Sequence, residues 1–119
     1  MELKDQVCSL ELAKELEKLG IKQESLFYWI KRNNEDGWEI DTNIIPDDLF
    51  GISKPITYSA YTVAELGEML PTWITTEKRE EKSFLCRSEG LFYNVFAKTE
   101  ANARAKMLIY LIKEKLIKV

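Results

Sequence analysis

The chain has 119 residues, 45% of them hydrophobic and 31% charged, with a formal net charge of −3 at pH 7. These values are typical of one globular domain, spanning residues 1–119, and they exclude a disordered chain. The longest apolar run, Met107 to Ile112, is far shorter than the ~18 residues of a membrane-spanning helix. The first residues do not combine a basic with an apolar segment, so we expect a cytoplasmic protein without membrane contact.

The residue types that usually carry catalysis are scarce. There is no histidine, which removes the commonest general base and zinc ligand. Cys8 and Cys86 belong to no CxxC pair, and we expect both to be unpaired, structural thiols. The isolated glycines form no phosphate loop, and no serine lies in a recognised nucleophile motif. We therefore expect no enzymatic activity, no cofactor and no metal.

The first half of the chain predicts a helix and then a hairpin. Ser9 can cap a helix that Gly20 ends, with leucines on one side and charged residues on the other. Residues 25–30 are rich in aromatic and β-branched residues, and residues 38–40 form a second short strand. Asp36-Gly37 fits the turn between these two strands.

The middle of the chain predicts an irregular segment and a short helix. Residues 41–57 combine prolines and acidic residues with many apolar side chains, so we expect this segment to pack on the domain rather than to act as a linker. Thr62 and Glu65 then have the spacing of a capping box, and Pro71 ends the helix that follows.

The second half predicts another hairpin and a long helix. Residues 73–75 are a short strand, and the charged run 77–82 is expected to be an exposed turn. Residues 83–87 and 91–97 pair around residues 88–90. The resulting order is helix, hairpin, helix, hairpin, helix. It predicts an α+β fold in which a mainly antiparallel sheet, built from both hairpins, packs against the C-terminal helix.

The C-terminal helix, residues 99–119, has two apolar faces. One face contains Ala105, Leu108 and Ile112, and we expect it to lie across the sheet. The other is a narrower stripe of Ala103, Met107 and Tyr110. Because one face suffices to hold a helix on its domain, we treat this stripe as a candidate interaction surface. The simpler alternative is that the first helix covers it within the chain.

Several segments resemble small uncharacterised proteins encoded by bacterial prophages and mobile elements. They are residues 7–14, Leu26 to Trp29, residues 61–71, and the start of the last helix at residues 99–111. The resemblance covers most of the chain and consists of structural segments. It implies a genomic setting and assigns no activity and no residue roles.

Two segments partly resemble ligand-binding motifs, one for calcium and one for RNA, but each lacks residues that its motif requires. Residues 32–37 place a glycine as in a calcium loop, but Arg32 and Asn43 stand where such a loop needs carboxylates. Residues 89–96 have the rhythm of an aromatic RNA-binding strand, but Glu89 and Leu91 replace its basic and first aromatic residues. Alternation there puts Phe92, Asn94 and Phe96 on one face of a strand.

These observations favour a small non-enzymatic protein that acts through protein contacts, as an adaptor or accessory protein, with an unidentified partner or as a homodimer. The alternative is a weak single-stranded nucleic-acid-binding module that uses the sheet aromatics, Phe27 and Trp29 or Phe92 and Phe96, with the basic C-terminal helix. Nucleic acid is the less favoured partner, because residues 1–50 are acidic and the rest only mildly basic.

Overall fold

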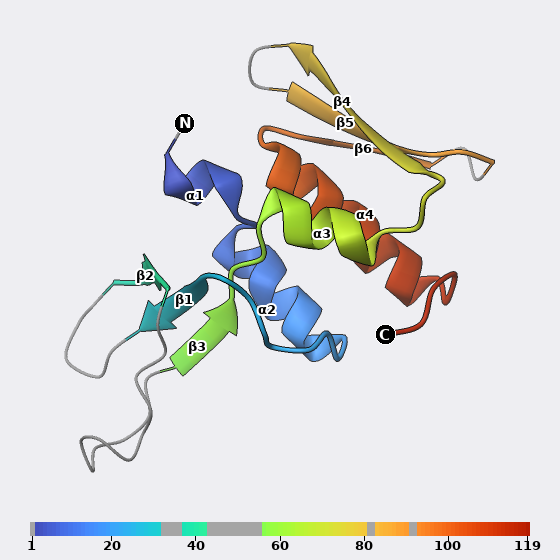
Figure 1. Cartoon of the computed structure of the whole chain (residues 1–119). Helices are drawn as coiled ribbons and strands as arrows, with labels where there is room; N and C mark the ends of the chain where they lie inside the picture. The colour runs from blue at the N-terminus through green and yellow to red at the C-terminus, as the bar shows by residue number, and fades with distance from the viewer. Residues whose placement is uncertain (1, 32–36, 43–55, 81–82, 91–92) are drawn as a thin grey trace.

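The computed structural model describes residues 2–31, 37–42, 56–80, 83–90 and 93–119. Two helices are followed by three strands, one helix, three more strands and a last helix (Figure 1). The helices are α1 (Leu3–Gln6), α2 (Leu10–Lys18), α3 (Val63–Met69) and α4 (Glu100–Lys113). The strands are β1 (Tyr28–Lys31), β2 (Glu39–Asp41), β3 (Ile56–Ser59), β4 (Ile74–Glu80), β5 (Ser83–Ser88) and β6 (Tyr93–Ala97).

Three of the helices begin at side-chain caps. Ser9 caps α2 by accepting from the backbone N–H of Leu12, and Thr99 caps α4 by accepting from Asn102. Thr62 and Glu65 form a complete capping box at α3, as the sequence predicts. Each capping side chain accepts a hydrogen bond from a backbone N–H of the first turn, which has no acceptor inside its own helix. Helix α1 has no side-chain cap, and its four residues were not predicted.

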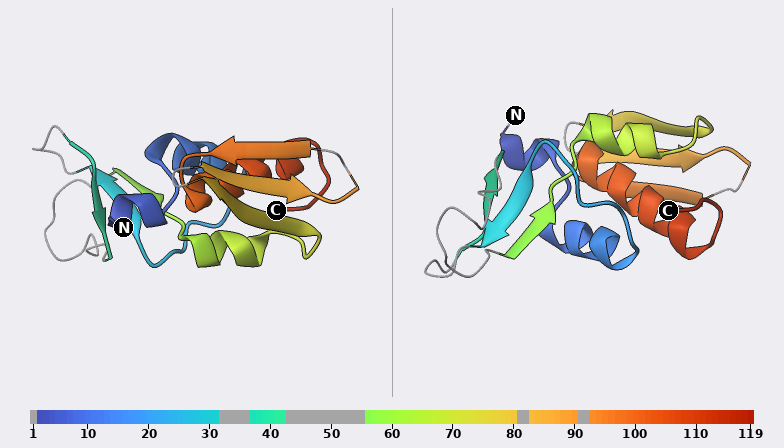
Figure 2. Two further views of the ribbon diagram at one scale, coloured as in Figure 1. Left: turned by 90° about the horizontal axis from the view of Figure 1, so that it is seen from above. Right: turned by 60° about the horizontal axis from the view of Figure 1, so that its bottom comes forward.

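Helix α4 is the centre of the molecule. Helices α2 and α3 lie on opposite sides of it, and the sheet β4–β5–β6 covers a third side (Figure 2). One core cluster joins Ala105 and Leu108 of α4 to Leu16 of α2 and Leu66 of α3. A second cluster joins the other face of α4 to the sheet. Both apolar faces of α4 are therefore covered within the chain.

The strands form two antiparallel sheets of three strands, ordered β2–β1–β3 and β4–β5–β6. The α+β fold, with antiparallel strands and a C-terminal helix packed on them, is confirmed. The prediction that both hairpins share one sheet is wrong. Strand β3 was not predicted, and it gives the first hairpin a third strand that begins with Ile56 and Thr57, the end of the predicted irregular segment.

The prediction that the charged run 77–82 is an exposed turn is wrong for residues 77–80, which belong to a strand. Residues 74–80 are one strand, β4, paired with β5 from Ile74 opposite Ser88 to Lys78 opposite Phe84, with a register shift between Lys78 and Glu80. Charged side chains are tolerated because β4 is an edge strand whose last four residues are exposed. The pairings of β1 with β2 and of β5 with β6 confirm the two predicted hairpins. The predicted Asp36 turn, the calcium-like loop and most of residues 41–57 lie outside the described residues.

The last helix is shorter than predicted. It ends at Lys113, and Lys115 adopts a positive φ of 58°. The backbone N–H of Leu116 then donates to the carbonyl of Leu111, which closes the helix end. Leu116, which lies beyond this end of the helix, is 44% exposed.

Candidate interaction site

The stripe predicted as an interaction surface is mostly core. Ala103 and Met107 have no exposed surface, and they pack against Cys86 and Val95 of the sheet. Helix α4 presents this stripe to the sheet, whereas the Ala105 and Leu108 face meets the other helices. The sequence assignment of the two faces was therefore reversed. Ala103 and Met107 are not available to another molecule, and the cover comes from the sheet rather than from the first helix.

Tyr110, the third residue of the stripe, remains half-buried at the edge of that sheet. Its ring stacks on the ring of Tyr93 from β6, with centroids 3.5 Å apart and planes 9° from parallel. Stacked aromatic pairs add stability beyond the apolar area that they bury. This stack fixes the start of β6 on the C-terminal half of α4.

The two cysteines are unpaired and buried, as predicted. Burial raises the pKa of the Cys8 thiol to about 11, and burial is also the main cause that raises the pKa of Cys86. Both thiols are therefore protonated at neutral pH. Because the thiolate is the reactive form, neither position is suited to nucleophilic chemistry.

Arg104 is a structural tie rather than an anion-binding residue. Its Nη1 donates to the carbonyl oxygen of Val63 at 2.8 Å, and its Nε donates to Oγ1 of Thr76 at 3.2 Å. One guanidinium thus holds α3, α4 and β4 together. A methyl group at Gly67 would lie 2.3 Å from that Nη1, so the glycine makes room for the tie.

Strand β6 is an open edge of its sheet. Tyr93 is bonded at both its N–H and its C=O to the Ser88 hydroxyl of β5, so its backbone groups face β5. Backbone groups alternate along a strand, which turns those of Asn94 and Phe96 away from β5. In the part of the chain that the structure describes, no strand pairs with this outer edge.

The side chains of β6 alternate as the sequence predicts. Val95 is 7% exposed and packs toward α4, whereas Phe96 is 60% exposed. Phe96 lies opposite Leu85 on the face of the sheet turned away from α4. It is the largest side chain among the clearly exposed hydrophobic residues of the described ranges.

A groove of about 710 Å³ runs beside this edge. Strand β6 forms one wall and α2 forms the other, while α4 supplies the floor with Ile109 and Tyr110. Leu12 of α2 adds an apolar side chain to the far wall. The open backbone edge and the apolar floor thus lie next to each other.

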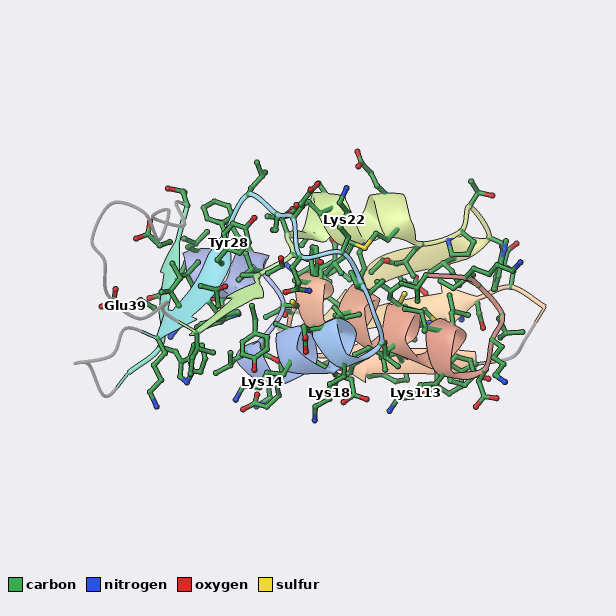
Figure 3. All side chains as sticks on the ribbon, turned by 90° about the horizontal axis from the view of Figure 1, so that it is seen from below. Lys14, Lys18, Lys22, Tyr28, Glu39 and Lys113 are labelled. Carbon is green, nitrogen blue, oxygen red and sulfur yellow. The ribbon has the colours of Figure 1, made fainter. Side chains whose placement is uncertain are left out.

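Charged groups surround the apolar floor. The lining contains three glutamates and two lysines, which leaves a net charge of −1: Glu11, Glu15, Glu114, Lys106 and Lys113. Lys113 Nζ lies 2.6 Å from the Glu15 carboxylate, and this contact lowers the pKa of Glu15. Figure 3 shows Lys113 on the same side of the molecule as Lys14 and Lys18 of α2.

The nucleic-acid alternative needs groups that the fold separates. Helix α4 packs on the face of the sheet opposite the Phe96 side chain, although Lys106 and Lys113 of α4 line the groove beside β6 together with Phe96. Trp29 is held by its ring N–H, which donates to the carbonyl of Cys8 at 3.0 Å, and it packs against the helical core. Phe92 lies outside the described residues. Glu77 lies opposite Leu85 on the Phe96 face of the sheet, and its carboxylate pairs with the basic side chains of Arg79 and Arg87.

Two further kinds of site are absent from the described residues. Within the described ranges, no three acidic or sulfur-bearing side chains gather where they could hold a metal ion. None of the described helices has the length and apolar character needed to cross a membrane.

Comparison of the chain with protein-family models, curated proteins and solved structures finds no match.

Proposed function

We propose that this chain is a non-enzymatic protein-interaction module that binds a partner at the β6 edge and in the groove between β6 and α2. The observation that carries this proposal is the exposed Phe96 on an edge strand that contains no charged residue. An unpaired edge invites pairing, and natural proteins usually block such edges with charges, prolines or bulges. Strand β6 has none of these devices over Tyr93–Ala97.

The open edge offers backbone groups to a partner, and the groove beside it adds a surface that the partner's side chains can contact. Ile109 and Tyr110 offer an apolar floor, and the rim carries charges of both signs. Protein interfaces commonly combine an apolar centre that includes aromatic side chains with a polar rim. The protonated, buried thiols support a role in binding rather than in covalent chemistry. A prophage or mobile-element setting, which the sequence resemblance suggests, is part of the same proposal.

The proposal is tested by selecting ligands with the purified protein and then changing the edge. A displayed library of random peptides is selected against the wild type, and enriched peptides are measured by calorimetry. Phe96→Lys adds a charge to the edge strand, and we expect it to weaken binding at least tenfold, about 1.4 kcal/mol. Thr75→Lys is the matched control, because Thr75 is an exposed residue on β4, the opposite edge of the same sheet.

The outcomes separate the two functions. Peptides that bind wild type and Thr75→Lys equally well, and Phe96→Lys poorly, support the β6 site. Equal binding by all three proteins contradicts it. If the protein instead binds single-stranded oligonucleotides, with an affinity that falls steeply as salt increases, the nucleic-acid alternative takes its place.

A further inference from the structure

We propose that the β6 site takes its partner by strand addition: an extended segment of another protein, about five residues long, pairs with Tyr93–Ala97 as a fourth strand. This inference rests on the proposed function and specifies how the partner is bound. Strand addition is one of several ways to bind a peptide; placing a helix in a groove is another. Three features of the β6 region favour the strand.

The first feature is the backbone. The N–H and C=O groups of Asn94 and Phe96 point away from β5, because those of Tyr93 are bonded to Ser88 on β5. An antiparallel segment can exchange hydrogen bonds with both residues and so pair four backbone groups. A helix cannot pair them, since its own backbone groups are used internally.

The second feature is the position of the groove. A strand added beside β6 continues the sheet over the floor formed by α4. Its inward side chains then lie above Ile109 and Tyr110 and beside Leu12. Because side chains alternate along a strand, every second residue of the partner segment should be apolar, with β-branched residues favoured.

The third feature is the far wall. Helix α2 lines the groove opposite β6 through Glu11, Leu12 and Glu15. The β6 strand of a second copy would arrive attached to its own β5 and α4, which would have to be accommodated beside the α2 wall. The groove therefore fits one strand with nothing bulky beside it, which favours a segment of a different protein over a homodimer.

The charges of the groove select the segment further. Lys113 is already paired with Glu15, whereas Glu11 and Glu114 contribute to the net negative charge of the lining. Acidic residues in the partner would be repelled by that charge. The expected ligand is an extended, β-prone segment with alternating apolar residues, flanked by basic rather than acidic residues.

The probe is a blocked synthetic peptide, Lys-Thr-Val-Thr-Val-Thr-Lys, added to the full chain. We expect it to slow hydrogen exchange of the Asn94 and Phe96 amides by roughly tenfold at saturation. The amides of Val95 and Ala97, which face β5, should change little. Two matched peptides serve as controls: one has glutamates in place of both lysines, and one is methylated at every central backbone N–H. We expect the first to bind more weakly and the second not to bind.

The results decide between strand addition, another way of binding at the β6 site, and a homodimer. Protection of Asn94 and Phe96 with the weaker binding of both control peptides supports strand addition. If the peptide binds and Phe96→Lys abolishes binding, but the two amides exchange as before, strand addition is wrong and the proposed site stands. If the peptide does not bind at millimolar concentration, strand addition is overturned. If light scattering shows a dimer in which the two amides are already protected, a second copy occupies the edge.

Discussion

The two edges of the β4–β5–β6 sheet are built differently. Strand β4 carries four consecutive charged residues, Glu77 to Glu80, and its register with β5 shifts between Lys78 and Glu80. Strand β6 has no charged residue, a regular register and an exposed Phe96. Charges and irregular pairing are common means of protecting an edge from other strands. The sheet is therefore protected on one side and open on the other.

The two edges also differ in how they are attached to the helices. Arg104 ties β4 to α3 and α4 by hydrogen bonds, whereas β6 is held by the stacked rings of Tyr93 and Tyr110 and by the burial of Val95. A cavity next to the tie, lined by Thr76 and Arg104, measures about 310 Å³, compared with about 710 Å³ for the groove beside β6. In the proposed function, one edge of this small sheet serves structure and the other serves contact with a partner.

The largest effect is expected on the protected side. Arg104→Ala should lower the free energy of unfolding by about 2–3 kcal/mol, because the Val63 carbonyl and the Thr76 hydroxyl both lose a charged donor. Lys106→Ala, an exposed position on the same helix, should change it by less than about 0.5 kcal/mol. Urea denaturation followed by circular dichroism measures both. Equal effects of the two substitutions would show that Arg104 is not a tie.

On the open side of the sheet, the stack of Tyr93 and Tyr110 should contribute less to the free energy of unfolding than Arg104 does. Tyr110→Ala should cost about 1–2 kcal/mol through loss of ring contact with Tyr93. Tyr110→Phe keeps the ring and is the control, with an expected change within about 0.5 kcal/mol. The same denaturation experiment applies. A Tyr110→Ala protein as stable as wild type would mean that β6 is held by Val95 alone.

Removing the charges of β4 should make the two edges alike. The double variant Lys78→Val with Glu80→Val replaces two exposed charges by β-prone apolar residues. We expect self-association at concentrations where the wild type is monomeric, with a stability change below about 1 kcal/mol. Sedimentation velocity detects the association. Lys78→Arg with Glu80→Asp keeps the charges and should behave as wild type; if the apolar variant does so too, charge is not what protects β4.

The smallest effect concerns the far wall of the groove. Lys113 holds the pKa of Glu15 below its ordinary range, so Lys113→Met should raise that pKa. A lowered carboxyl pKa stabilises the fold above the pKa of the unfolded chain, and this contribution is lost as the pH falls through the folded value. Any stability difference between the two proteins should therefore disappear in acid. A carbon-detected NMR titration of Glu15 checks the shift, and an unchanged pKa would show that the pair does not persist in solution.

Local signals in the sequence were sufficient for much of the secondary structure. The caps at Ser9, Thr62 and Thr99 mark the starts of their helices, and alternation correctly divides the side chains of β6 between two faces. Only the start of β4 was predicted, as a short strand at residues 73–75, because the charged residues that follow resemble a solvated turn, and charge is what an edge strand tolerates. Helix α4 has two apolar faces, and nothing local tells which of them meets a sheet.

The candidate site could be predicted only in part. Alternation groups Phe96 with Asn94 on one face of β6, but it does not tell that this face is the exposed one. The groove could not be found, because it joins Leu12 to Ile109 and to β6, which are far apart in the sequence. Whether a strand is at an edge depends on the order of strands in the sheet, which a single sequence does not contain. The stripe of Ala103 and Met107 was misassigned for the same reason.

The openness of the β6 edge is most directly tested by amide hydrogen exchange of the isolated protein, measured residue by residue by NMR. The account predicts fast exchange at Asn94 and Phe96, whose N–H groups face away from β5, and slow exchange at Val95 and Ala97, which face it. Slow exchange at all four residues in a monomer would show that the edge is already covered, and it would contradict both the proposed site and strand addition.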